Sequence, residues 1–157
     1  MTGVTAQALR DLVAWVEDGI SPPPSTSFVM TSDGGIRLSQ DAEVRGGVQP
    51  VARASANGCV RAEVAVGETV VLTGLAWQVG AGAIVAAEWD PEGTGHFERF
   101  AVDGTQPSVT IETTHVYTRP GTYLACFRVG SHRDGKNGTK PYGRNNARVR
   151  VVVSDPP

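Results

Sequence analysis

The chain has 157 residues and a formal net charge of −2, and a charge of this size does not favour a nucleic-acid partner. Apolar residues make up 40% of the chain, enough for one core, and no apolar run approaches the roughly 18 residues that a membrane span requires. The 19 glycines and 10 prolines favour short strands and turns over long helices. We therefore expect a mainly β domain without a nucleic-acid or membrane partner.

The first predicted element is a helix over residues 6–18. Thr5 can cap its start, and Gly19 followed by Pro22 ends it. An isolated helix of this length is marginal in water, so its apolar stripe must be covered by the β domain, by another protein domain or by a second protomer. The stripe consists of residues at helical spacing: Leu9, Leu12, Val13, Val16 and Ile20.

A proline-rich, stiff linker over residues 21–27 follows the helix. Residues 28–50 are glycine-rich and weakly patterned, so we expect extended chain with one short strand at most. We assign residues 1–50 to this helix, linker and extended segment, and residues 51–157 to a β-sandwich. Asn57-Gly58 lies between two alternating runs, and this dipeptide predicts a hairpin turn.

From residue 63 onward the pattern is all β, with strands expected over 69–75, 84–89, 109–114, 122–129 and 147–153. Side chains alternate between the two faces of a strand, so each strand has one predicted core face. The inward residues are Val70, Leu72, Val85, Ala87, Trp89, Val109, Ile111, Tyr123, Ala125, Phe127, Val129, Ala147, Val149, Val151 and Val153.

The same alternation places Cys126 on the outer face, which disfavours a disulfide through the core. Two alternatives stay open for Cys59 and Cys126: a disulfide on the outer face or two free thiols.

A buried Trp on one strand and a Tyr-x-x-x-Gly-x-Tyr corner leading into another are typical of immunoglobulin-like sandwiches. Together with Val-Gly-Glu-Thr-Val over residues 66–70, they resemble a PKD domain, the polycystic-kidney-disease type of this sandwich, across about residues 60–153. The resemblance implies an all-β, immunoglobulin-like (PKD-type) sandwich after the helix and linker. It implies structural roles for Trp89, His115, Tyr117, Gly121 and Tyr123.

The sequence departs from the PKD pattern after the predicted strand that contains Trp89. PKD domains usually carry Trp-Asp-Phe-Gly-Asp-Gly, whereas residues 89–95 read Trp-Asp-Pro-Glu-Gly-Thr-Gly. The turn is therefore rebuilt, and the resemblance does not extend to a cation site at this turn.

The beginning of the chain has a second resemblance. Residues 8–24, with Arg-Gly-Gly-Val-Gln-Pro at 45–50, are similar to the last helix and exit segment of some bacterial α/β-hydrolases of esterase type. This resemblance implies that the sandwich follows a catalytic domain. In a longer exported chain the sandwich would be extracellular or periplasmic, although the first twenty residues are amphipathic and not signal-like.

The sequence indicates no catalytic centre of its own. A nucleophile elbow of the form Gly-x-Ser-x-Gly does not occur, and the neighbouring Ser131, His132 and Asp134 are expected in a solvated turn of a long loop. The spacing of His96, His115 and His132 does not suggest a zinc site.

Three carboxylates, Glu88, Asp90 and Glu92, share one strand face. Such a group suits acid/base chemistry on a glycoside or a hard cation, but we expect a solvated strand end, broken at Pro91. His115 is expected to pack against Tyr117 and to donate a hydrogen bond to the backbone.

Residues 131–146 form the best candidate binding site. With Arg128, Arg148 and Arg150 this segment holds half of the 14 basic residues, against one acid. Basic side chains beside a tyrosine suit an acidic glycan, a phosphate or an acidic patch on a neighbouring domain, and a solvated basic loop is the alternative. The candidate binding residues are Arg133, Lys136, Lys140, Tyr142 and Arg144.

These features predict a non-catalytic accessory or interaction module, without a cofactor, that packs on or positions a hydrolase-like domain. A carbohydrate-binding module is the first alternative, with Trp77 or Tyr142 as the stacking side chain, although we expect Trp77 to be a partly buried strand end. A stand-alone hydrolase is the second.

Overall fold

The computed structural model describes residues 3–22, 27–39, 44, 49–78, 82–132, 135–137 and 143–156. The chain divides into two compact units, Met1–Val48 and Gln49–Pro157. The first unit contains helix α1 (Gly3–Asp18) and a hairpin of β1 (Val29–Met30) and β2 (Ile36–Arg37). The second unit contains strands β3 to β10 and the 3₁₀ helix η1 (Gly135–Asn137).

Helix α1 begins at Gly3, earlier than expected, so Thr5 lies within its first turn and not at its cap. It ends where expected: Gly19 has a φ of +68°, and its amide donates to the carbonyl of Trp15 (3.2 Å). The apolar stripe is exposed, from 47% at Leu9 to 75% at Val16. Within the described residues, no helix is both long and apolar enough to cross a membrane.

Residues 28–50 contain a short hairpin where at most one strand was expected. Val29 pairs with Arg37 and Met30 with Ile36, and the amide of Thr31 donates to the carbonyl of Gly35 (2.8 Å). Of the proline-rich linker, residues 23–26 lie outside the described residues.

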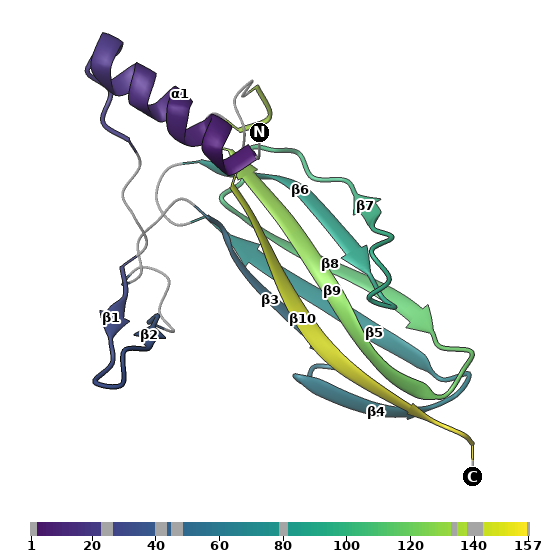
Figure 1. Ribbon diagram of the computed structural model, residues 1–157. Helices are drawn as coiled ribbons and strands as arrows, with labels where there is room; N and C mark the ends of the chain where they lie inside the picture. The colour runs from purple at the N-terminus through teal and green to yellow at the C-terminus, as the bar shows by residue number, and fades with distance from the viewer. Residues whose placement is uncertain are drawn as a thin grey trace. The chain divides into compact units, whose positions relative to one another are not determined.

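The second unit is a β-sandwich of two sheets (Figure 1). One sheet has the order β4-β10-β9-β6-β7 and the other β3-β5-β8; β10 and β4 pair in parallel, and the other neighbours pair antiparallel. The strands are β3 (Val51–Ala56), β4 (Arg61–Ala65), β5 (Thr69–Trp77), β6 (Ala83–Asp90), β7 (Glu98–Phe100), β8 (Ser108–Val116), β9 (Gly121–His132) and β10 (Gly143–Ser154).

The five predicted strands are all present, each longer than expected, and β3, β4 and β7 join them. Asn57 and Gly58 form the expected turn, with φ values of 49° and 77°, and Ala56 and Cys59 exchange two hydrogen bonds of 2.9 Å. The flanking strands nevertheless do not pair as a hairpin, because β3 pairs with β5 and β4 with β10. The Val71 amide donates to Oδ1 of Asn57, and the Asn57 amide donates to the carbonyl of Val71. These bonds attach the turn to β5, and the chain changes sheet there.

The core lies between the two sheets, with Trp89, Phe127, Leu72, Tyr117 and Val151 fully buried in it. Two predicted inward residues, Val85 and Ala147, are only partly buried and are not part of the core cluster. The register of β6 against β9 shifts between Ile84 and Ala86, and this bulge reverses the alternation. Ile84 therefore joins the core cluster in place of Val85.

Both cysteines are free thiols, Cys59 exposed and Cys126 buried. Cys126 lies on β9 opposite Arg148, outside the core cluster, as the alternation predicts. Strand β10 lies between β9 and β4, the strand that follows Cys59. Two strand spacings amount to about 9.5 Å, whereas a disulfide requires Cα atoms within roughly 7 Å. The sheet order therefore explains why no bridge forms.

At Gly74 on β5 the backbone of one sheet lies against a side chain of the other. A Cβ atom added to Gly74 would lie 2.6 Å from three atoms of the Phe127 ring, which comes from β9 in the other sheet. Trp89 on β6 packs beside Phe127, with ring centroids 5.1 Å apart. Because glycine has no side chain, position 74 leaves room for Trp89 and Phe127 at the centre of the core.

We predict that Gly74→Ala destabilises the sandwich by about 1–3 kcal/mol, because the methyl group overpacks the core against Phe127. Urea unfolding measures the change, with Thr110→Ala on the exposed side of neighbouring β8 as the control. In an unconstrained strand the change from Gly to Ala stabilises by roughly 0.5–1 kcal/mol. A gain in stability would therefore show that Gly74 is not under this constraint.

Candidate functional site

The predicted basic loop is shorter in the structure than in the sequence analysis. Strand β9 continues to His132 and β10 begins at Gly143, so only residues 133–142 separate the two strands. Ser131 and His132 were expected in a solvated turn, but they are buried, with exposures of 2% and 7%. Asp134 lies outside the described residues.

Two of the five candidate binding residues lie within the described part of the chain. Lys136 is exposed on η1, and its amide donates to the carbonyl of Gly104 (3.1 Å), which attaches η1 to the loop before β8. Arg144 is exposed on β10 opposite Gly130. Arg133, Lys140 and Tyr142 lie outside the described residues, so the proposed loop site stays a prediction.

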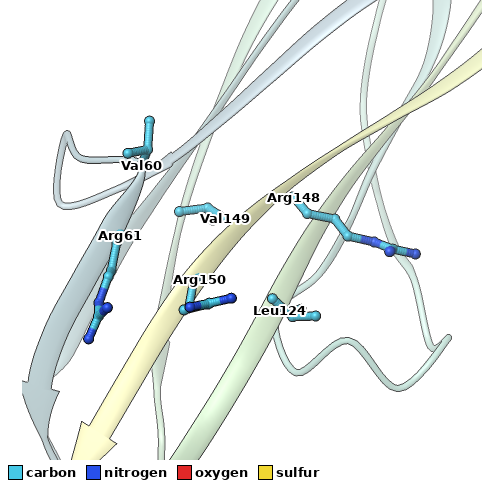
Figure 2. Close-up of a pocket in the computed structure, with 6 residues that line it drawn as sticks. All are labelled: Val60, Arg61, Leu124, Arg148, Val149 and Arg150. Atoms are coloured by element: carbon cyan, nitrogen blue, oxygen red, sulfur yellow. The ribbon is translucent and has the colours of Figure 1, made fainter. Parts of the chain in front are cut away.

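A second basic surface lies on the outer face of the five-stranded sheet. An open depression of about 310 Å³ runs across β4, β10 and β9 there (Figure 2). We call it the arginine groove, and it is lined by Val60, Arg61, Leu124, Arg148, Val149 and Arg150. Arg150 pairs with Arg61 on one side and with Leu124 on the other, so these three residues form one row across the sheet.

The arginines of this groove differ in their partners. Arg61 forms an ion pair with Glu63 (2.6 Å), and both side chains are more than half exposed. Arg148 and Arg150 are exposed, and no carboxylate in the described part of the chain forms an ion pair with either. Arg148 and Arg150 were expected to be part of a basic region, but Arg61 was not, because the parallel pairing of β4 with β10 has no local signal in the sequence.

Glu88 is neutralised by two arginines farther along the same face. Arg128 donates to one carboxylate oxygen (2.5 Å) and Arg99 to the other (3.0 Å), and the Arg128 guanidinium stacks on the Phe97 ring at 3.6 Å. Burial of the carboxylate opposes its ionisation, but the bonds and charges of Arg128 and Arg99 outweigh burial and lower the pKa of Glu88. The carboxylate therefore stays charged and paired at neutral pH.

Asp90 organises the turn that replaces the usual PKD sequence. Its carboxylate accepts hydrogen bonds from the amides of Gly93 (2.9 Å), Thr94 (3.2 Å) and Gly95 (2.6 Å). Asp90 is 2% exposed, and β6 ends there, before Pro91, as expected. The expected solvated strand end is therefore wrong for Asp90 and for Glu88, since both carboxylates are buried and bonded.

The three carboxylates do not fit a cation site. Glu88 is bonded to arginines and Asp90 to backbone amides. Glu92 instead lies 3.5 Å from Nε2 of His115. Across the described residues, no group of three or more His, Cys, Asp or Glu side chains could hold a metal ion.

The corner between β8 and β9 contains two tyrosine bonds. The Tyr117 hydroxyl donates to the carbonyl of Pro91, and that of Tyr123 to the carbonyl of Arg119, each at 2.9 Å. The centroids of the two tyrosine rings lie 4.4 Å apart, and the His115 and Tyr117 rings form a T-shaped contact with centroids 4.6 Å apart. Burial raises the pKa of Tyr117 to about 12, with smaller contributions from Glu92, Tyr123 and Asp90.

Two other residues of this region were assigned from the sequence. Gly121 begins β9 at the same corner, opposite Val153. The expected bond from His115 to the backbone is not among those that the described residues form; its Nε2 atom faces Glu92 without a hydrogen bond.

Trp77 does not present a free stacking surface. It is partly buried at the end of β5, as expected, and the guanidinium of Arg53 lies 5.2 Å from the centre of its ring.

Comparison with known proteins settles the family. The family model of the PKD domain matches residues 53–153, more than half of the chain. The chain belongs to the PKD-domain family. PKD domains are non-catalytic modules.

Solved structures with a similar fold include two archaeal domains. The PKD domain of an M14-like peptidase from Thermoplasmatales archaeon SCGC AB-540-F20 is 12% identical, with a TM-score of 0.49, over 69% of this chain and 99% of that one. A CARDB domain from Pyrococcus furiosus, solved in complex with di-metal ions, is also 12% identical, with a TM-score of 0.47, over 69% and 96%. The search of curated proteins found no match.

We predict that Glu88→Gln lowers the free energy of unfolding at pH 7 by about 1–2 kcal/mol, because Arg128 and Arg99 lose a charged partner. Since the pKa of Glu88 is lowered in the folded state, its contribution is present above pH 4.5, the unfolded value, and is lost as the pH falls through the folded value. In denaturant unfolding from pH 7 to pH 3, the difference in unfolding free energy between the wild type and Glu88→Gln should decrease as the pH falls. Glu63→Gln, in the exposed pair with Arg61, is the control, and an equal effect of both changes would contradict the assignment.

We predict that Tyr117→Phe costs about 1 kcal/mol near pH 7 because the carbonyl of Pro91 loses its donor. The raised pKa of Tyr117 means that its contribution is complete below about pH 10, the unfolded value, and is lost as the pH rises toward 12. The stability of the wild type should therefore fall more steeply above pH 10 than that of Tyr117→Phe. Parallel pH profiles for the two proteins would show that Tyr117 does not titrate with unfolding.

Proposed function

We propose that this chain is the accessory part of a larger hydrolase, in which the PKD domain is a non-catalytic module and α1 packs on the catalytic domain. The proposal extends the family assignment, which establishes a non-catalytic module and not its position in a longer protein.

The exposed apolar stripe of α1 carries the proposal. Leu12 and Val13 are each 50% exposed and Val16 is 75% exposed, although they lie on one side of the helix. A helix of 16 residues gains most of its stability from burying such a face, so the stripe requires a partner surface. The similarity of residues 8–24 to the last helix of esterase-type hydrolases supports a catalytic domain as that partner.

The contacts of the buried polar groups in the sandwich fit an accessory role. Its buried carboxylates, Glu88 and Asp90, are engaged by arginines and backbone amides, and the buried Tyr117 supports the corner. These groups serve the fold, which leaves the outer surface of the domain for contacts with other molecules.

The native polypeptide tests this proposal directly. An antibody against the sandwich would isolate the protein from its source cells, and mass spectrometry would identify its N-terminal peptides. We expect a longer polypeptide with hydrolase sequence before residue 1. A native chain that begins at Met1 would contradict the proposal and would leave the sandwich itself or a second protomer as the partner of α1.

In the longer protein we predict that Val16→Glu releases α1 from the catalytic domain, because a carboxylate cannot be buried in an apolar contact without a large cost. Limited proteolysis would then cut the chain near residues 19–27 at least about tenfold faster, because proteolysis follows the population of the opened state. Ala14→Glu is the matched control, since residues 14 and 16 lie about 200° apart around the helix. Equal cleavage of both variants would show that the stripe is not the contact.

A further inference from the structure

We propose that the arginine groove binds an extended acidic polypeptide segment whose carboxylates occur on alternate residues. This inference concerns the outer face of the five-stranded sheet and does not depend on the contact proposed for α1.

The charges of the groove indicate an anionic ligand. Arg148 and Arg150 project from β10 on the face opposite the buried Val149 and Val151, and neither has an ion-pair partner among the described residues. Arg61 lies directly beside Arg150 on β4. Glu63, its partner, is 70% exposed in an ion pair that water screens, so a stronger ligand can replace it at little cost.

The spacing of the arginines indicates a linear, extended ligand. Arg148 and Arg150 are two residues apart on a continuous strand, which separates them by roughly 6.6–6.8 Å along β10. An extended polypeptide has the same repeat, so carboxylates on alternate residues can face both guanidinium groups in register. In Figure 2 the Arg148 side chain extends from β10 in the direction of β9.

The lining between the arginines favours a peptide over a sugar chain. Leu124 is 46% exposed and Val60 is 84% exposed, and they give the groove an apolar lining on which the methylene groups of glutamate side chains can lie. Binding of sugar rings commonly relies on exposed aromatic side chains, and the lining residues include none. Glutamate-rich extended segments therefore match the groove better than acidic glycans.

Fluorescence anisotropy with the full chain tests the inference. The probe is a labelled synthetic peptide that alternates Glu and Thr, and a peptide of the same composition with its Glu residues in one block provides the spacing control. We expect the alternating peptide to bind more tightly, and Arg148→Gln/Arg150→Gln to weaken its binding about tenfold at low salt. Arg37→Gln/Arg119→Gln removes the same charge from exposed positions outside the groove and should change binding by less than about twofold.

Three results would overturn the inference. The first is no binding of the alternating peptide by the wild type at low salt. The second is equal weakening by both double variants, which would indicate a general charge effect. The third is binding of polygalacturonate, but not of the peptide, that depends on Arg148 and Arg150, which would identify the groove as a glycan site. Circular dichroism and thermal unfolding would verify that each variant is folded.

Discussion

The sandwich depends on the contact between Gly74 and the Phe127 ring. Any side chain on β5 at this point would hold the two sheets apart, whereas glycine allows Phe127 and Trp89 to fill the centre of the core. Close packing of this kind fixes the positions of β6 and β9 relative to the other sheet. The geometry of the outer face follows, because the same two strands carry Glu88, Asp90 and Arg128 on their other side.

Strand alternation thus connects the core to the surface. On β10, burial of Val149 and Val151 requires Arg148 and Arg150 to face outward, and a slip of one residue would exchange the two sets. On β6, burial of Trp89 places Glu88 and Asp90 outside, where arginines and backbone amides neutralise them. The acidic side chains of this face are therefore satisfied within the domain, while two arginines remain available to a ligand.

Much of this arrangement follows from the sequence, because alternation and turn residues are local signals. These local signals predicted the five long strands, the burial of Trp89 and Phe127, and the outward position of Cys126. The pairing of strands that are distant in the sequence has no such signal. Asn57-Gly58 predicted a turn, but it did not predict that β3 and β4 join different sheets. The pairing of β4 with β10 brings Arg61 beside Arg150. The bulge near Val85 and the burial of Glu88 and Asp90 likewise depend on partners from distant strands.

Because the core fixes the strand register, it places the arginines that we propose as the binding surface for an acidic segment. Backbone NMR of the full chain, titrated with the alternating Glu-Thr peptide, tests this claim residue by residue. We expect amide shift changes centred on Arg150 and extending to Arg61 and Leu124 on the neighbouring strands. Changes confined to residues 133–142, or to the sheet of β3, β5 and β8, would contradict it.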